Sequence, residues 1–318
     1  MTQTKQTQNT QPWYRLSLAA YIVIVFIGLF TVADYGFTWD EHFRMLGGDA
    51  KLEYYKELFS GKNPKPPADN YPGLFDLPLA LTHDILPNLG TRSEKGHVWS
   101  FIFGLGGLLA VWRTAAIIAG ERAGFWALIL LTATPRYYGH MFFNPKDIPF
   151  AGTYMLGVWA LVSLFKSLPR PSWRSVIIAG LAAGFAMSTR IAGALILCYF
   201  GLFIGLYLLV TYFASQQEIS EKLRKVPNDL VYWLFRGLAS GLIALIPLLI
   251  FWPAMHSNPF VRISSTIEKV QSFGWDGPVL VNGQFWQATD LPAYYVPYWL
   301  LKTLSDPALL LLLLCICG

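Results

Sequence analysis

Residues 191–213 read IAGALILCYFGLFIGLYLLVTYF, a stretch without Asp, Glu, Lys, Arg or His. It exceeds the roughly 20 residues that an α-helix needs to cross the hydrocarbon core of a bilayer. The whole chain has the same character, since 54% of its residues are hydrophobic, 14% are charged and the mean hydropathy is +0.42. A soluble domain, whose surface must face water, is excluded. The sequence predicts an all-α, polytopic membrane protein.

Similar apolar stretches recur along the chain, so a signal peptide or single anchor does not explain them. We expect eight spans, near 16–33, 97–118, 123–139, 148–165, 175–189, 191–213, 237–252 and from Pro307 onward. Residues 1–15 are polar and are expected to form a disordered tail, and 16–318 one transmembrane domain. Only about ten apolar residues follow Pro307, too few for a crossing, so we expect the sequence to be a fragment.

The basic residues predict the orientation of the chain. Lys and Arg are in excess in the tail and in segments 119–122, 166–174 and 214–236, which is typical of the cytoplasmic side. Loops 34–96 and 253–306 then lie on the outer side, with all five histidines and nearly all aspartates. The net charge of +5 does not indicate nucleic acid as a partner, because the basic residues are spread over separate loops.

The first candidate for chemistry is Trp39-Asp40-Glu41-His42, at the start of the outer loop 34–96. Two neighbouring carboxylates near lipid resist joint ionisation, so one can have a raised pKa and act as a general base. The alternative is that these acids only solvate the start of the loop. An amphipathic helix is expected to follow, from Phe43 to Phe59, and interfacial helices are expected in the aromatic-rich segment 253–306.

Two further polar positions fall on the same side. The turn 140–149 brings His140, Lys146 and Asp147 between two apolar stretches, although Asp147 is equally suited to cap the next helix. Arg190 is the only charged residue in 175–213, and a turn there would place it at the outer surface. A guanidinium in that position suits a lipid phosphate, the alternative being simple snorkelling to headgroups.

The histidines do not have the spacing of a zinc site. No pair lies four residues apart on one predicted helix, and no His-Glu-x-x-His pattern occurs. No metal ligands are assigned, and a divalent cation held by carboxylates stays open as a cofactor.

The order of these motifs resembles that of the membrane glycosyltransferases of the GT-C superfamily. The resemblance is strongest to the dolichyl-phosphate-mannose protein mannosyltransferase family (glycosyltransferase family 39) and its bacterial relatives. It rests on Asp40-Glu41, His42-Phe43, Tyr71-Pro72-Gly73, Asp147-Ile148-Pro149, Gly184 to Arg190 and Tyr294 to Thr303. The His-Pro-Pro-like turn of the family is replaced by Tyr71-Pro72-Gly73, and no MIR-type domain is present, which puts a protein acceptor in doubt.

The resemblance implies inverting transfer of a sugar from a polyprenyl-phosphate carrier to a hydroxyl of a glycan, lipid or protein on the outer face of the membrane. The enzyme would lie in a bacterial inner membrane with a cytoplasmic N-terminus. Asp40, helped by Glu41, would be the catalytic base. Phosphate and substrate binding would fall to Arg190, Lys146, Asp147, His42, His140 and Arg136. A transporter or lipid flippase is the alternative, and it would need charges along a path through the bilayer.

Overall fold

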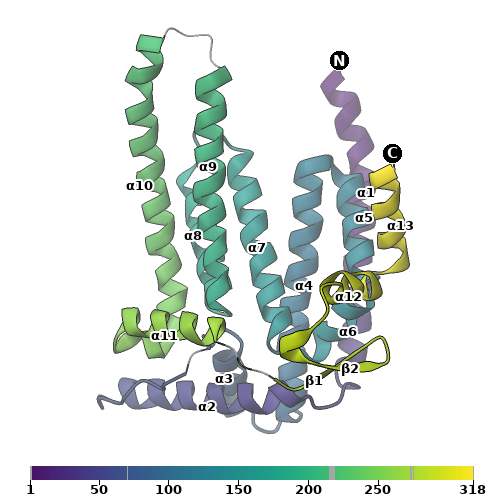
Figure 1. The fold of residues 1–318 in the computed structure, drawn as a ribbon, viewed down its shortest axis with the longest axis vertical. Helices are drawn as coiled ribbons and strands as arrows, with labels where there is room; N and C mark the ends of the chain where they lie inside the picture. Colours follow the sequence, from purple (N-terminus) through teal and green to yellow (C-terminus); the bar gives the residue numbers. More distant parts are fainter. Residues whose placement is uncertain (1, 70, 215–218, 273, 275, 318) are drawn as a thin grey trace.

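The structure is a computed structural model that describes residues 2–69, 71–214, 219–272, 274 and 276–317 (Figure 1). Its helices are α1 Thr2–Thr31, α2 Trp39–Phe59, α3 Asp76–Ile85, α4 Arg92–Ala119, α5 Glu121–Thr132, α6 Pro135–Phe143, α7 Asp147–Phe165, α8 Trp173–Met187, α9 Leu195–Ala214, α10 Ile219–Phe251, α11 Pro259–Gln271, α12 Tyr295–Thr303 and α13 Asp306–Cys317, with short 3-10 helices η1 Ile191–Ala194, η2 Pro253–His256 and η3 Ala288–Asp290. The predicted all-α class is confirmed.

Five helical segments within the described residues are long and apolar enough to cross a membrane. They are Gln11–Thr31, Arg92–Ala119, Asp147–Phe165, Ile191–Ala214 and Pro227–Phe251. Large apolar side chains on these helices remain exposed, as Val210 on α9 and Leu242 on α10 illustrate. Because such surface is stable only against lipid, the chain is an integral membrane protein.

Three expected segments take a different form. The expected span 123–139 is divided into α5 and α6, because Pro135 begins a new helix after the break at residues 133–134. Near the C-terminus, α12 and α13 meet at a bend of 115°. The residues expected as a disordered tail are helical from Thr2 onward, since a helix formed in a span extends by one hydrogen bond per added residue.

Close packing of small residues holds the bundle together. A Cβ atom added to Gly152 on α7 would lie 2.2 Å from the Phe103 carbonyl oxygen on α4. One added to Gly184 on α8 would lie 2.4 Å from the Ala244 carbonyl oxygen on α10. Such contacts let helix backbones approach closely in lipid. They fix the first turn of α7 and the end of α8, both of which contribute to the site below.

A layer of short elements covers one end of the bundle. Helix α2 runs across this end, at the bottom of Figure 1, and α11 lies nearly parallel to it beneath α8–α10. A hairpin of β1 Pro278–Val281 and β2 Gln284–Gln287 lies beside them. Its turn, Asn282-Gly283, has positive φ angles of 50° and 80°, as a type I′ turn requires. The Asn-Gly signal was available in the sequence, where only helices were expected.

The segment between α1 and α4 is fastened to this end of the bundle by hydrogen bonds to backbone carbonyls. The amide of Gly73 donates to the Phe251 carbonyl at 2.6 Å, and that of Leu74 donates to Ser188 at 3.0 Å. The indole of Trp252 donates to the Asp69 carbonyl at 2.9 Å. The loop is therefore an ordered part of the fold that lies directly over the ends of α8 and α10.

Candidate active site

The start of α2 places the two neighbouring carboxylates in different surroundings. The Glu41 side chain is 3% exposed. Its Oε1 accepts from the Thr38 amide at 2.8 Å and the Thr38 hydroxyl at 2.9 Å, and its Oε2 accepts from Ser93 Oγ at 2.6 Å. His97 Nε2 lies 3.4 Å from Oε1. Burial acts to raise the pKa of Glu41, but the hydrogen bonds from His97, Ser93 and Thr38 outweigh it and leave that pKa below its ordinary value.

Asp40, one residue earlier, faces a hollow at the end of the bundle that α2 covers. Its side chain is 43% exposed, and Lys146 Nζ lies 3.9 Å from Oδ2. The described part of the chain offers this carboxylate no closer partner. The hollow encloses about 220 Å³ and is lined by Thr38, Trp39, Asp40, His140, Phe143, Asn144 and Pro145. Asp40 is thus a carboxylate that a substrate can reach.

Asn144 orders the turn between α6 and α7. Its Oδ1 accepts from the amides of Lys146, at 3.1 Å, and Asp147, at 2.8 Å. Its Nδ2 donates to His140 Nδ1 at 2.7 Å and to Asp147 Oδ2 at 3.2 Å. Because an amide nitrogen only donates, His140 Nδ1 accepts this bond. Burial, together with Arg136, lowers the pKa of His140 against the opposing effect of Asp147. The Asn144 side chain already accepts from the first amides of α7. The Asp147 side chain therefore does not cap this helix, which was the alternative that the sequence left open.

Asp147 instead meets Arg190. Arg190 Nη2 lies 2.5 Å from Asp147 Oδ1, and the guanidinium carbon lies 5.8 Å from the centre of the Phe150 ring. Arg190 follows the end of α8 in extended conformation, where η1 begins. Its side chain is about one-third exposed, at 32%, but its Nε is buried and has no hydrogen-bond acceptor in the described part of the chain. This leaves a donor free for an anion.

A buried ionic cluster supports α2 from below and was not predicted. The Lys51 side chain is fully buried and pairs with Asp69 and, at 3.2 Å, with Asp76. Arg44 Nε lies 2.7 Å from Asp76 Oδ1. Burial raises the pKa of Asp76, and both cations act in the opposite direction. Arg44 and Lys51 are seven residues apart, on one face of a helix, which is the signal that could have revealed the cluster.

The ionic cluster is connected to the hollow through Tyr71. The Tyr71 amide donates to Asp69 Oδ1 at 2.8 Å. Its ring centre lies 5.5 Å from the Arg44 guanidinium and 5.8 Å from Lys146 Nζ, both within the range of cation–π attraction. Through the Asn144 side chain, which bonds to the Lys146 amide, to His140 and to Asp147, the structure joins Asp40, Lys146, Asp147, Arg190 and His140 in one set of contacts.

The remaining predicted residues lie at the edge of this set. His42 is exposed and packs against the Phe43 ring at 5.8 Å. Arg136 is exposed in the first turn of α6 and reaches the site only through its effect on the pKa of His140. Among the described residues, no group of three or more His, Cys, Asp and Glu side chains could hold a metal ion.

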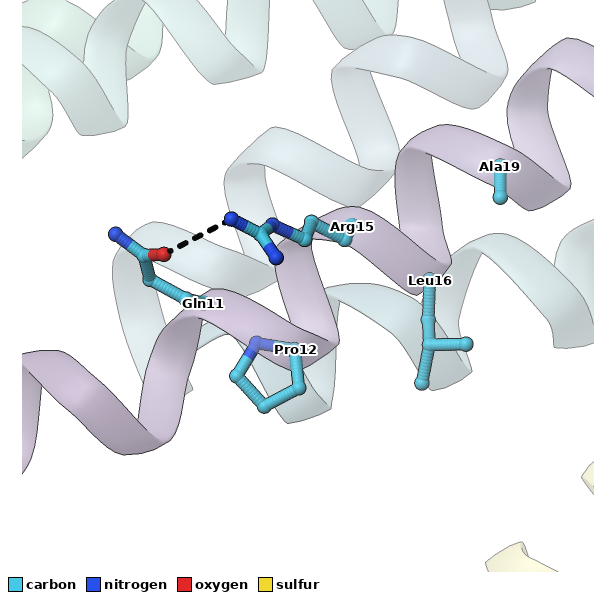
Figure 2. Close-up of a pocket in the computed structure, with 5 residues that line it drawn as sticks. All are labelled: Gln11, Pro12, Arg15, Leu16 and Ala19. Carbon is cyan, nitrogen blue, oxygen red and sulfur yellow. Dashed lines mark hydrogen bonds between the residues drawn. The ribbon is translucent and has the colours of Figure 1, made fainter.

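Another hollow lies along the N-terminal part of α1, at the end of the molecule opposite α2 (Figure 1), and Figure 2 shows its lining. It is lined by Gln11, Pro12, Arg15, Leu16 and Ala19, and Arg15 Nη2 donates to Gln11 Oε1 at 3.5 Å. Its lining includes neither a carboxylate nor an imidazole. It offers no acid–base chemistry.

A layer that carries carboxylates and cations covers one end of a bundle of membrane-spanning helices, an arrangement that fits a membrane glycosyltransferase of the GT-C type. Residues 79–251 match the family described as dolichyl-phosphate-mannose-protein mannosyltransferase, and the chain belongs to that family. The matched region contains His140, Lys146, Asp147 and Arg190 and begins after Asp40. No curated protein and no solved structure matches the chain.

Proposed function

We propose that this enzyme transfers a sugar, with inversion, from a polyprenyl phosphate to an acceptor hydroxyl on the outer face of a bacterial inner membrane, with its N-terminus in the cytoplasm. One observation carries the proposal. The reachable carboxylate of Asp40 and the cations Lys146 and Arg190 belong to one connected set of contacts, which runs through Asn144 and Asp147. A base and a phosphate-binding group are thereby available to opposite ends of a breaking sugar–phosphate bond.

In the proposed reaction the acceptor oxygen attacks the anomeric carbon while its proton passes to Asp40 Oδ. The bond from the anomeric carbon to the phosphate oxygen breaks, and the phosphate leaves with the electron pair. Arg190 and Lys146 stabilise the charge that develops on the phosphate. One displacement of this kind inverts the anomeric configuration. Asp147 holds Arg190 until the donor phosphate takes its place beside the guanidinium.

Glu41 is better suited to position Asp40 than to contact the acceptor. All its described partners are donors from Thr38, Ser93 and His97, and it is almost fully buried. These bonds fix the first turn of α2. Thr38 Oγ1 also lies 3.1 Å from the Phe143 carbonyl oxygen, so this turn is packed against the end of α6. Asp40 is thereby held against the turn that carries Lys146.

The other predicted residues are assigned to substrate contacts. His140 lines the hollow beside Asp40 and, when neutral, has a nitrogen available for a sugar hydroxyl. His42 and Arg136 are exposed toward the same end of the bundle, where the acceptor and the lipid phosphate would approach. The prenyl tail of the donor would lie among the spans, in contact with their apolar surfaces.

The test is a transfer assay with purified enzyme in lipid nanodiscs. Polyprenyl-phosphate sugars and nucleotide sugars are offered as donors, with acceptors drawn from envelope glycans and lipids. We expect product only from the lipid-linked donor, with inverted anomeric configuration by NMR. A deletion strain should accumulate the same lipid-linked sugar. Transfer from a nucleotide sugar, retention of configuration, or uptake of solute into vesicles without a glycosylated product would contradict the proposal.

A further inference from the structure

A group of arginine and aromatic side chains lies at the end of the bundle opposite Asp40, where the connection between α7 and α8 meets α10. Here two arginines flank one tyrosine. The Arg170 guanidinium lies 4.2 Å from the centre of the Tyr232 ring, and that of Arg236 lies 4.7 Å from it. Arg236 also lies 4.4 Å from the centre of the Trp173 ring. We call Arg170, Trp173, Tyr232 and Arg236 the inner arginine cluster.

The positive charge of the inner arginine cluster is only partly compensated. Asp229 Oδ1 lies 3.2 Å from Arg170 Nη2, and both side chains reach solvent. Arg236 Nη1 donates at 2.8 Å to the carbonyl of Pro171, which is a neutral acceptor. Two guanidiniums around one ring repel each other, so an anion near Arg236 would stabilise the arrangement. Within the described residues, no carboxylate pairs with Arg236.

A buried donor in the same place lacks a partner. The Tyr232 hydroxyl is inaccessible to solvent and makes no hydrogen bond to any residue that the structure describes. Leaving such a group unsatisfied costs about 1–3 kcal/mol, so it is expected to be paired in the working state of the protein. A phosphate beside the Tyr232 hydroxyl, within reach of both guanidiniums, would satisfy the hydroxyl and the charges together.

The neighbouring aromatic residues indicate where that acceptor comes from. Trp173 is 45% exposed and Phe235 is 61% exposed, and their rings meet edge to face at 5.8 Å. Exposed Trp at the end of a span is typical of the headgroup level of a bilayer. Trp173 also begins α8, whose N-terminus adds partial positive charge. The cluster thus combines a polar, cationic part with an apolar part that faces lipid.

We propose that the inner arginine cluster binds the phosphate of an anionic phospholipid. Arg170, Arg236 and the Tyr232 hydroxyl bind the phosphate oxygens, and Trp173 and Phe235 contact the glycerol and upper acyl chains. Basic pockets between spanning helices recognise anionic headgroups in this way. The proposal does not depend on the proposed function, because the cluster shares no residue with the candidate active site.

The experiment measures lipid retention by native mass spectrometry after reconstitution in phosphatidylcholine nanodiscs with and without phosphatidylglycerol. We expect the wild-type protein to retain phosphatidylglycerol in preference to phosphatidylcholine. Arg170→Gln and Arg236→Gln should each weaken retention about fivefold. Tyr232→Phe, which keeps the ring and removes only the hydroxyl, should weaken it by a smaller factor. The unfolding temperature in phosphatidylcholine alone reports whether each variant folds.

Arg122→Gln is the matched control. Arg122 is exposed at the same end of the bundle and lies 5.7 Å from the centre of the Trp13 ring, and among the described residues no second guanidinium contacts that ring. It should leave retention unchanged. Equal weakening by Arg122→Gln would reduce the effect to general surface charge and overturn the proposal. The proposal would also be overturned if the wild-type protein retained both lipids equally, or if Tyr232→Phe and both arginine variants retained phosphatidylglycerol fully. It would likewise be overturned if inorganic phosphate alone raised the unfolding temperature as much as phosphatidylglycerol does.

Discussion

Asp40 and Glu41 are neighbours in the first turn of α2, yet the structure gives them opposite surroundings. Asp40 is 43% exposed beside a hollow and has only Lys146 Nζ at 3.9 Å, whereas Glu41 is 3% exposed and is surrounded by donors. Successive side chains of an α-helix point about 100° apart, and this single step places Asp40 beside the hollow and Glu41 in the interior. The comparison shows that α2 has a face open to the hollow, which we propose to be the reactive face, and a buried supporting face.

The largest effect is expected on the reactive face. Asp40→Asn removes the proposed base and should lower turnover about 100-fold to 10,000-fold. Because Asp40 makes no close hydrogen bond, the unfolding temperature should hardly change. The measurement is steady-state transfer with purified protein, with Asp84→Asn as the control, an exposed carboxylate that pairs with Lys56 at 2.6 Å. A variant that transfers at the wild-type rate would remove Asp40 from the mechanism.

On the supporting face, Lys51→Met should give the largest loss of stability. It leaves the buried carboxylate of Asp76 without one of its two cations, and breaking such pairs costs about 3–5 kcal/mol. The measurement is thermal unfolding in detergent. The matched control is Lys62→Met, because Lys62 is exposed and pairs with Glu57 at 3.1 Å. If the two variants unfold at the same temperature, the ionic cluster does not support the loop.

Arg190→Gln tests the phosphate end of the reactive face. Loss of the guanidinium should lower transfer about 100-fold to 1,000-fold, and Arg190→Lys should recover only part of it because a lysine cannot make two parallel hydrogen bonds. The control is Arg92→Gln, which removes a guanidinium from the same end of the bundle, where Arg92 pairs with Asp49 at 2.5 Å. It should leave the transfer rate per folded molecule unchanged. Complete recovery with lysine would mean that Arg190 acts as a simple point charge.

Glu41→Gln should have the smallest effect and should act on stability. An amide cannot accept all of the bonds that the carboxylate accepts, so we expect a loss of about 1–3 kcal/mol at neutral pH. The folded pKa of Glu41 is lowered, so its contribution is complete above the unfolded value, about 4.3, and is lost as the pH falls through the folded value. The difference in unfolding temperature between wild type and variant should therefore shrink on acidification. A difference that is constant with pH would contradict this origin.

Much of the architecture could be predicted because it depends on local composition. Apolar stretches identified the spanning helices, and the single charge of 175–213 marked the turn at Arg190. The division of 123–139 into α5 and α6 was not predicted, because packing within the bundle decides whether a helix continues through Pro135 or starts anew there. The full burial of Lys51 depends on Asp69 and Asp76, which only the folded loop brings beside it. The contrast between Asp40 and Glu41 depends on which side of α2 faces Ser93 and His97.

The most direct test of this division measures Asp40→Asn and Glu41→Gln side by side. Single-turnover transfer from a polyprenyl-phosphate sugar is recorded for each variant and divided by its folded fraction, and donor retention is measured on the same samples. The account predicts that Asp40→Asn retains donor and stability but loses the chemical step, whereas Glu41→Gln loses stability and keeps most of the rate per folded molecule. Equal loss of rate per folded molecule in both variants would contradict it.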